Sequence, residues 1–357
     1  MTRINEIKPL LISPLPPPSG GDSTWSERYL QYCNKKKIEI KHVNTALIGK
    51  RSENASDSFS LFDEIKRTFR IWKMIKKSIK SKNVNIAHLN TNCSPKGLIR
   101  DYWSSHILRK KHIPYIVHCR CNVQDQIKKS KIGLFFFRKM CSKSSRVLVQ
   151  NSFSLDYLKT LGINQVILMP NHIESSYISE NHSIRNKIEK IAFIGHIKKT
   201  KGVSEIVEVA KIKKGIDFYL VGPITEQELL HNANNIHFLG EKSLNEVKGM
   251  LDDSDVLLFP TYTEGFSNSL LEAMSRGLPS ITTNVGANKD MIEDEGGIVL
   301  SENSVEDIIK ALEIMDDNKV RQKMSIWCIE KVKRTYAIKI VFSKICSLYR
   351  EVLDEIH

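Results

Sequence analysis

Short β-rich runs alternate with helix-forming stretches along almost the whole 357-residue chain, and this rhythm restricts the fold more than any other feature. Apolar runs such as 115–118 and 256–259 are too short for helices, and longer amphipathic or apolar stretches separate them. Strands joined through helices pair in parallel, and helices then cover both faces of the sheet. The length fits about two domains of ordinary size. We therefore predict an α/β protein with two doubly wound, Rossmann-like domains.

The predicted strands fall into two sets of six. They span residues 8–13, 38–43, 85–90, 115–118, 146–150, 166–169, 191–194, 218–221, 236–239, 256–259, 280–283 and 298–300. A polar segment without periodicity lies between the sets and is interpreted as a linker. The predicted divisions are an N-terminal domain (1–172), the linker (173–190), a C-terminal domain (191–335) and a last helix (336–357).

Charge divides the chain at the same place. Residues 1–170 carry 31 Lys and Arg against 11 Asp and Glu, a formal charge of +20, whereas the remaining residues carry −6. A basic half joined to a mildly acidic half indicates that only the first half meets an anionic surface or a polyanion.

Membrane spans, disulfides and metal sites are not expected from the sequence. No apolar run approaches the ~18 residues of a membrane span. The seven cysteines are odd in number and lack paired ligand spacing, which favours reduced thiols in a cytosolic setting. Asp253-Ser254-Asp255 resembles a metal-binding pattern but precedes a predicted strand instead of following one. We therefore expect no metal.

The segment 260–279, PTYTEGFSNSLLEAMSRGLP, combines two acids with a helix start between them. Ser267 or Asn268 is a good N-cap, and the exposed amides of such a turn bind anions. Glu272 lies inside the helix, roughly 6 Å further along its axis at the usual rise per residue, and Glu264 lies outside it. This spacing suits a ligand with a phosphate in the middle and hydroxyls at both ends, such as a sugar nucleotide.

The stretch EGFSNSLLEAMSRGLP resembles the Glu-x7-Glu motif of the family 4 glycosyltransferases of bacterial polysaccharide synthesis, which have the GT-B fold. Further segments resemble the same family in the same order along the chain. They are PPPSGG (16–21), VQNSFSLDYLKTLG (149–162), PNHIE (170–174) and IAFIGHIKKTKG (191–202). Each match is short, but their order and spacing together are specific.

The resemblance implies a retaining transfer of sugar from a nucleotide-diphosphate donor without a metal. Two domains would face each other across a cleft, the first for the acceptor and the second for the donor, with the last helix packing back on the first. Glu264 would position the donor sugar, Lys201 would neutralise the leaving diphosphate, and His118 would lie near the reacting sugar. The donor-binding residues would be Gly20, Gly21, Gly195, His196, Gly265, Phe266, Ser267, Asn268, Ser269 and Glu272, the last on the ribose. The family commonly has arginine where this chain has His196. A histidine is largely neutral near pH 7 and cannot donate the two parallel hydrogen bonds with which a guanidinium binds a phosphate.

The expected partners are a UDP-sugar, with a GDP-sugar as the alternative, and a lipid-linked saccharide acceptor in a pathway such as O-antigen or capsule synthesis. Two basic amphipathic stretches, 61–82 and 128–146, fit an anionic membrane interface. They equally fit core-facing helices with a solvated basic face. The basic half favours a cytoplasmic protein peripheral to the inner membrane.

Two other classes of function remain as alternatives at this point. The basic half would permit a nucleic-acid-binding protein, but no nucleic-acid module is recognisable and we expect no such partner. A closer alternative is another GT-B enzyme, such as a sugar-nucleotide epimerase or a soluble sugar-phosphate synthase.

Overall fold

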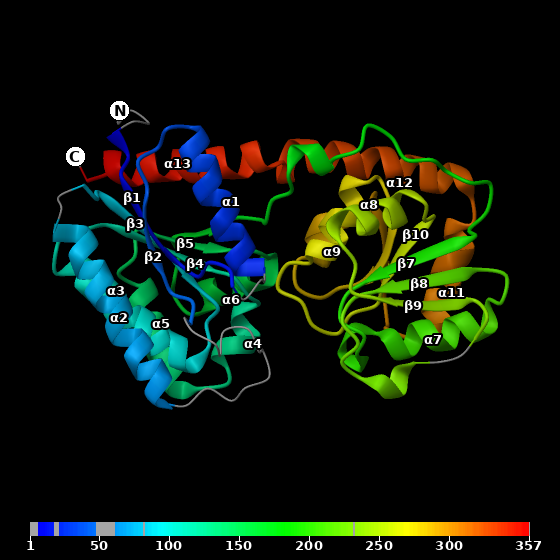
Figure 1. Cartoon of the computed structure of the whole chain (residues 1–357), viewed down its shortest axis with the longest axis horizontal. Coiled ribbons are helices and arrows are strands. Elements are labelled where there is room, and N and C mark those ends of the chain that lie inside the picture. Colours follow the sequence, from blue (N-terminus) through cyan, green and yellow to red (C-terminus); the bar gives the residue numbers. More distant parts are fainter. Residues whose placement is uncertain (1–5, 18–20, 48–60, 81–82, 231–232, 357) are drawn as a thin grey trace. The chain divides into compact units, whose positions relative to one another are not determined.

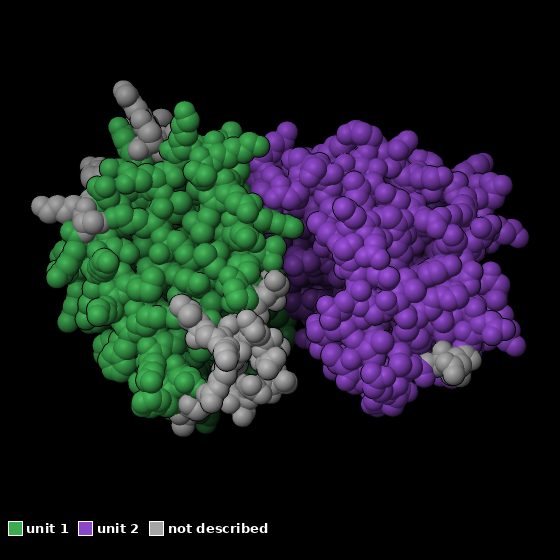
Figure 2. Space-filling model, in the orientation of Figure 1, with its two compact units in different colours: residues 1–170, 341–357 green, residues 171–340 purple. Residues whose placement is uncertain are grey.

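The computed structural model describes residues 6–17, 21–47, 61–80, 83–230 and 233–356 of the chain. The chain forms two compact units, shown in different colours in Figure 2. The first unit contains residues 1–170 and 341–357, and the second contains residues 171–340. None of the described helices combines the length and apolar character that a membrane crossing requires.

The first unit is built on a six-stranded parallel sheet in the order β2-β1-β3-β4-β5-β6. Its strands are β1 (Pro9–Ser13), β2 (Lys41–Asn44), β3 (Ile86–Thr91), β4 (Tyr115–Cys119), β5 (Arg146–Val149) and β6 (Val166–Leu168). Its helices are α1 (Gly21–Lys35), α2 (Leu61–Lys80), α3 (Pro95–Arg109), α4 (Val123–Ile127), α5 (Lys131–Cys141), α6 (Ser152–Thr160) and, from residue 341 onward, α13 (Ile338–Asp354).

The two faces of this sheet are covered by different helices (Figure 1). Leu10 and Leu89 pack with Ile75 of α2 in one hydrophobic core. The residues that alternate with them point to the opposite face, where His88 of β3 contacts Tyr349 of α13. Because side chains alternate along a strand, this second face receives the polar residues of β3 and β4.

The second unit has a parallel sheet in the order β12-β11-β10-β7-β8-β9. Its strands are β7 (Lys190–Ile194), β8 (Asp217–Val221), β9 (Ile236–Gly240), β10 (Val256–Phe259), β11 (Ser280–Thr283) and β12 (Gly297–Leu300). Its helices are α7 (Val203–Ile212), α8 (Leu244–Asp252), α9 (Asn268–Ser275), α10 (Asn288–Ile292), α11 (Val305–Met315) and α12 (Asn318–Lys331), followed by a π-helical turn (Val332–Tyr336). Helix α7 packs against α11, and α9 packs against α12.

Strand order reverses once in each sheet, between β1 and β3 in the first and between β7 and β10 in the second. In open α/β sheets ligands bind outside the carboxyl ends of the strands at such a reversal. A ligand site of the second unit is therefore expected in the loops that follow β7 and β10. The loop that follows β1 leads into α1 in the first unit.

The prediction of two doubly wound parallel sheets is confirmed, and most strand bounds agree to within one or two residues. The predicted strand 38–43 begins too early. Lys37 has a left-handed backbone, and the amide of Ile38 donates to the carbonyl of Cys33 at 2.9 Å. Ile38 is buried there as part of the C-terminal cap of α1, so its apolar side chain serves the helix end and not the strand.

The segment 173–190, expected as a linker, is folded onto the second unit. The amide of Ser179 donates to the carbonyl of Ser275 at 2.8 Å, and His182 Nε2 contacts the carbonyl of Ser254 at 2.9 Å. Backbone and side-chain bonds of this kind hold a polar segment in place even though it lacks periodicity. All seven cysteines are free thiols.

Candidate active site

Lys201 and Glu264 meet at the strand-order reversal of the second unit. Lys201 follows β7 in the 3-10 turn Lys199–Lys201, and Glu264 lies in the loop after β10. The Lys201 ammonium forms an ion pair with the Glu264 carboxylate and also donates to the carbonyl of Thr263 at 3.0 Å. Both side chains are 15% exposed. Two residues 63 positions apart thus form one charged pair that is partly shielded from water.

The loop that carries Lys201 is held against the end of β10 by backbone contacts. Gly202 ends the turn with a left-handed φ of 75°, and a Cβ placed there would lie 2.0 Å from the carbonyl oxygen of Pro260. The amide of Tyr262 donates to the carbonyl of Thr200 at 3.0 Å. Only a glycine permits this close approach, which sets the path of the chain beside Lys201.

Burial raises the pKa of the Glu264 carboxyl, and the neighbouring Lys201 and Lys198 act in the opposite direction. Carboxylates lose stabilising water when they are buried, so the ion pair with Lys201 compensates part of that loss. A second close approach stabilises the loop, since a Cβ on Gly286 would lie 2.5 Å from the carbonyl oxygen of Glu264. Both the backbone and the side chain of Glu264 are therefore held in place.

Helix α9 begins three residues after Gly265. Ser267 is the N-cap, and its hydroxyl accepts a hydrogen bond from the amide of Leu270 at 3.2 Å. The first amides of a helix lack partners within the helix. Among the described residues no group accepts from the amides of Asn268 and Ser269, so these amides can bind a ligand. This helix start lies in the same loop as Glu264.

Three of the predicted donor-binding residues make contacts that serve the fold. Phe266 is buried and meets Tyr336 edge to face at 5.9 Å. The carbonyl of Gly265 accepts from the amide of Ala287 at 3.1 Å. Asn268 Oδ1 accepts from Asn171 at 2.9 Å. The side chains of Phe266 and Asn268 are therefore engaged in the fold. The backbone amides of this turn are the groups that can bind a phosphate.

Glu272 lies one turn into α9 and is half-buried. Burial raises the pKa of the nearby Tyr177 hydroxyl, and the Glu272 charge raises it further. At the end of the same helix Arg276 forms two hydrogen bonds with Asp252, at 2.6 and 2.9 Å, and donates to the carbonyl of Tyr177 at 2.6 Å. These bonds fix the helix on which Glu272 stands.

The loop after β7 also contains the two other predicted residues. The amide of Gly195 donates to the carbonyl of Val221 at 2.9 Å and so continues the sheet. His196 is exposed as a residue, but its ring is partly desolvated. This desolvation and the charges of Lys198 and Lys201 lower its pKa. A neutral imidazole at this position does not supply the positive charge that an arginine would, so Lys201 is the cation nearest to Glu264 in the described loop.

In the first unit, His118 ends up inside the protein at the carboxyl end of β4. Its side chain is buried, with Nδ1 3.1 Å from Nε2 of His88 and Nε2 3.4 Å from a guanidinium nitrogen of Arg120. Burial lowers its pKa well below the usual value, and the charge of Arg120 lowers it further. Gly21 begins α1, and Gly20 lies outside the described residues.

Residues 175–326 match the family described as "Glycosyl transferases group 1". This segment contains the ion pair of Lys201 with Glu264, helix α9 and Glu272. This segment of the chain is therefore similar to that family. The resemblance deduced from the Glu-x7-Glu motif is thereby confirmed.

Two of the relatives are bacterial proteins whose names describe the transfer of sugars. The capsular polysaccharide biosynthesis glycosyltransferase CapM of Staphylococcus aureus is 26% identical over 197 residues, which are 52% of this chain and 51% of CapM. The UDP-Gal:alpha-D-GlcNAc-diphosphoundecaprenol alpha-1,3-galactosyltransferase of Escherichia coli is 33% identical over 110 residues, 30% of this chain and 28% of that protein. The matched segments thus span about half or less of these relatives.

Similarity in fold extends over the whole chain. The sucrose-phosphate synthase of Thermosynechococcus elongatus aligns with a TM-score of 0.79 and 13% identity, covering 98% of this chain and 100% of that structure. The GT-B fold that the sequence predicted is therefore confirmed.

The Asp253-Ser254-Asp255 pattern is structural. Asp255 is fully buried, and its Oδ2 accepts hydrogen bonds from the amides of Glu189 and Lys190, both at 2.9 Å. Its other oxygen pairs with Arg185 at 3.2 Å. The carboxylate therefore anchors the start of β7. Among the described residues no group of three or more His, Cys, Asp or Glu side chains is arranged to hold a metal.

The two basic helices α2 and α5 of the first unit bury only part of their apolar residues. In α2, Ile71, Ile75 and Ile79 are buried, whereas Phe62 and Phe69 are 62% and 63% exposed. Apolar residues of α2 thus face the core toward its C-terminal end, whereas two aromatic residues in its N-terminal half are exposed. The side chain of Leu61 lies outside the described residues.

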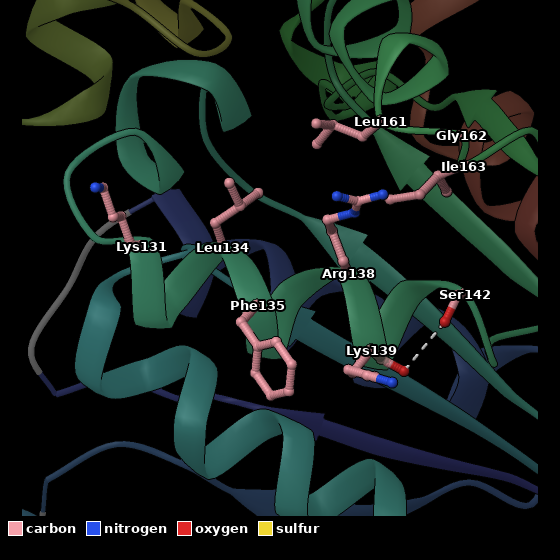
Figure 3. Close-up of a pocket in the computed structure, with 9 residues that line it drawn as sticks. All are labelled: Lys131, Leu134, Phe135, Arg138, Lys139, Ser142, Leu161, Gly162 and Ile163. Atoms are coloured by element: carbon pink, nitrogen blue, oxygen red, sulfur yellow. Dashed lines mark hydrogen bonds between the residues drawn. The ribbon is translucent and has the colours of Figure 1, made fainter.

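Helix α5 borders a surface groove of about 570 Å³. Figure 3 shows Lys131, Leu134 and Arg138 on one side of the helix, facing Leu161 and Ile163. Phe135 and Lys139 point to the other side of α5 in the same view. The groove is therefore lined by both apolar and cationic side chains.

Sequence reasoning missed several polar residues of the first unit that lie around His118. His88, Arg120, Asp22 and Tyr349 form a connected set with it. One signal was present, since the polar His88 lies between Ala87 and Leu89 in a strand that a parallel sheet buries on both faces. Nothing local in the sequence indicates the contact with Tyr349, which lies 261 residues away.

Proposed function

We propose that the chain transfers a sugar from a nucleotide-diphosphate sugar, a UDP-sugar in particular, to a lipid-linked saccharide acceptor with retention of configuration. The observation that carries this proposal is the Lys201–Glu264 pair beside the helix start of α9, at the strand-order reversal of the second unit. The Escherichia coli relative supports the choice of donor and acceptor, because its name specifies UDP-galactose and a diphosphoundecaprenol-linked sugar.

The donor diphosphate would bind between Lys201 and the amides of Asn268 and Ser269. The ammonium of Lys201 is already held in place by Glu264 and by the carbonyl of Thr263. Groups that are fixed before the reaction stabilise developing charge without the cost of reorienting solvent. Lys201 and the helix amides would thus stabilise the charge on the departing nucleoside diphosphate.

The two glutamates would bind the hydroxyls at the two ends of the donor. Glu264 lies outside the helix and next to the phosphate-binding cation, so its carboxylate would accept hydrogen bonds from the transferred sugar. Glu272 lies one turn inside α9 and would accept from the ribose diol. The pair therefore fits one ligand of defined length and not an acid/base pair that acts on a single bond.

The reaction would follow from this arrangement. The acceptor hydroxyl attacks the anomeric carbon on the face from which the diphosphate leaves, and the bond between that carbon and the diphosphate oxygen breaks. The proton of the acceptor hydroxyl passes to an oxygen of the leaving phosphate. Lys201 lowers the energy of this step through its charge. His118, which the family resemblance places near the reacting sugar, has both ring nitrogens engaged inside the first unit and would act through its neighbours.

Replacing Glu272 by alanine tests the ribose contact. Hydrogen bonds to a charged acceptor contribute about 1.5–3 kcal/mol each, so the loss of even one of them should raise KM for the sugar nucleotide roughly 10- to 150-fold. Initial rates at varied UDP-sugar concentration measure the change. The matched control is Glu313→Ala, because Glu313 is an exposed acid near the end of α11 that pairs with Lys213. A Glu272→Ala protein with wild-type KM would contradict the ribose assignment.

Product analysis separates the proposal from the other GT-B activities. The protein is incubated with a UDP-sugar and N-acetylglucosamine linked through diphosphate to a short prenyl chain, and the products are identified by mass spectrometry and NMR. Transfer gives an elongated lipid-linked saccharide with an α-linkage from an α-donor. An epimerised nucleotide sugar, or a soluble sugar phosphate as acceptor, would replace this proposal by one of the alternatives.

We also propose that the first unit binds an anionic membrane surface through α2 and α5. Support comes from its formal charge of +20, the exposed Phe62 and Phe69 of α2, and the cationic groove of α5. An interfacial helix of this type inserts its aromatic side chains while its lysines meet lipid phosphates.

Vesicle flotation tests the membrane proposal. Wild-type protein should bind vesicles that contain phosphatidylglycerol at low salt, and binding should fall as salt is raised, because exposed charges are screened. The double variant Phe62→Ser, Phe69→Ser should bind at least tenfold more weakly, since the full burial of even one aromatic side chain contributes roughly 1.5–3 kcal/mol. Ile314→Ser and Ile326→Ser together remove equally exposed apolar residues from the second unit and should change nothing. Equal binding by both double variants would contradict the role of α2.

A further inference from the structure

Five side chains of the first unit form a continuous row of hydrogen bonds. The Tyr349 hydroxyl lies 2.6 Å from Nδ1 of His88, and Nε2 of His88 lies 3.1 Å from Nδ1 of His118. Arg120 lies 3.4 Å from Nε2 of His118 and donates from Nε to Oδ1 of Asp22 at 3.2 Å. The row connects α13, β3, β4 and the first turn of α1.

Arg120 fixes the direction of the bonds in this row. A guanidinium only donates, so Nε2 of His118 accepts, and a neutral His118 must carry its proton on Nδ1. That proton is donated to Nε2 of His88, whose own proton then lies on Nδ1 and is donated to the Tyr349 oxygen. Burial lowers the pKa of His88 to about 3, with Arg120 contributing in the same direction. Both imidazoles are therefore neutral, and from Arg120 to Tyr349 each side chain donates a hydrogen bond to the next.

Only the Asp22 end of the row reaches solvent. The side chain of Arg120 is 1% exposed, and His88 and His118 are fully buried, whereas the side chain of Asp22 is 30% exposed. Within the described part of the chain, Oδ2 of Asp22 has no hydrogen-bond partner. Desolvation raises the pKa of this carboxyl, and its ion pair with Arg120 acts in the opposite direction. A buried network thus holds one carboxylate and leaves one of its oxygens accessible.

The position of Asp22 points to the kind of group that this oxygen can bind. Asp22 stands in the first turn of α1, which follows β1 at the strand-order reversal of the first sheet. A carboxylate at a helix start takes the place where an anion would otherwise bind, and its ion pair with Arg120 leaves no net positive charge there. Phosphate is disfavoured at such a place, and a neutral hydroxyl donor is suited to it.

We infer that Asp22 binds a hydroxyl of the saccharide acceptor, and that Arg120, His118, His88 and Tyr349 position its carboxylate. This inference rests on the proposed function, because it concerns the acceptor of that reaction. It assigns the acceptor contact to the first unit, whereas the donor residues Lys201, Glu264 and Glu272 belong to the second.

Kinetics with Asp22→Asn test the inference. The amide keeps an oxygen for Arg120 but removes the charge, so KM for a prenyl-diphosphate-linked N-acetylglucosamine should rise about tenfold or more. KM for the UDP-sugar and the rate of its hydrolysis without acceptor should remain within twofold of wild type. Asp125→Asn is the matched control, since Asp125 is an exposed aspartate in the first turn of α4 and should leave all three values unchanged.

A second variant covers the case in which the unpaired Arg120 prevents folding of Asp22→Asn. The double variant Asp22→Asn, Arg120→Met removes both charges, which restores a neutral interior, and should still show the raised acceptor KM. An unchanged acceptor KM in whichever of the two variants folds would overturn the inference alone. A wild-type protein that neither hydrolyses UDP-sugars nor transfers their sugar would overturn the proposed function as well.

NMR tests the positioning role independently of activity. Two-bond 1H–15N spectra of wild type should show His88 and His118 both protonated on Nδ1. In Tyr349→Phe the acceptor for His88 is gone, so His88 should change its tautomer signals and the acceptor KM should rise without a change in donor KM. Unaltered histidine signals together with an unaltered acceptor KM would remove Tyr349 from the proposed row.

Discussion

Replacing Lys201 by alanine is expected to reduce kcat/KM for the sugar nucleotide by roughly 10²–10³-fold, the cost of deleting one preorganised electrostatic group from a reaction site. Lys201 is the cation that pairs with Glu264 at the strand-order reversal, and its ammonium is held by two acceptors. Its loss removes charge stabilisation from the leaving diphosphate. Release of UDP from a UDP-sugar, followed in a coupled assay, measures the effect.

Two comparisons make this result specific. Lys211→Ala removes an exposed lysine of α7 that pairs with Glu208, and it should leave turnover unchanged. Lys201→Arg keeps the charge and should retain more activity than Lys201→Ala, although the planar guanidinium fits the ammonium's place imperfectly. Wild-type turnover by Lys201→Ala, with intact folding by circular dichroism, would exclude Lys201 from the diphosphate site.

Gly202→Ala is expected to produce the largest loss of stability among single substitutions near the site. The methyl group would lie 2.0 Å from the carbonyl oxygen of Pro260, and the residue would have to keep a φ of 75°. The left-handed backbone costs about 1–2 kcal/mol, and displacement of a packed backbone typically adds about 1–3 kcal/mol. Denaturant unfolding, with hydrogen exchange of β7 and β10 as the local readout, measures the change.

Gly240→Ala isolates the contribution of backbone strain. Gly240 lies in the same unit with a φ of 66°, and a Cβ there would have no atom within 4 Å. It should cost only about 1 kcal/mol, the expense of the left-handed conformation. Donor turnover should fall in Gly202→Ala, because the Lys201 loop moves away from Glu264, and should persist in Gly240→Ala. Equal destabilisation by both variants would show that the contact with Pro260 is unimportant.

The strands of both sheets could be predicted from the sequence because they are short apolar runs bounded by polar or glycine-containing loops. The strands at Val256–Phe259 and Ser280–Thr283 agree with the predicted bounds at both ends. Ile38 was assigned incorrectly because an apolar residue that caps a helix and one that starts a strand are alike in sequence. Their difference lies in the left-handed backbone of Lys37, which local composition does not specify.

The groups proposed to bind the donor in the second unit were predictable because most of them lie in one contiguous segment. Glu264, the turn and Glu272 fall within nine residues, so helix periodicity and capping preferences fix their relative placement. The family resemblance assigned Lys201 and Glu264 to one donor site, but their ion pair was not predicted, since the two residues belong to the loops of different strands. The sheet order, with β7 beside β10, brings these loops together.

The row in the first unit was not predictable from local patterns. His88 and Tyr349 are 261 residues apart, and Asp22 and Arg120 are 98 apart. The same limit applies to α2, where the amphipathic pattern does not say that Ile75 is buried while Phe69 is exposed. Whether an apolar face is covered depends on which elements reach it in three dimensions.

By itself the sequence determined the two-domain α/β architecture, the uneven charge and the donor motif, because each of these depends on residues close together in the chain. Tertiary structure decided which charges pair, which aromatic residues remain exposed, and that His118 is buried in a row ending at Asp22. Strand order and side-chain alternation control those contacts, and both arise only when distant segments pair into one sheet.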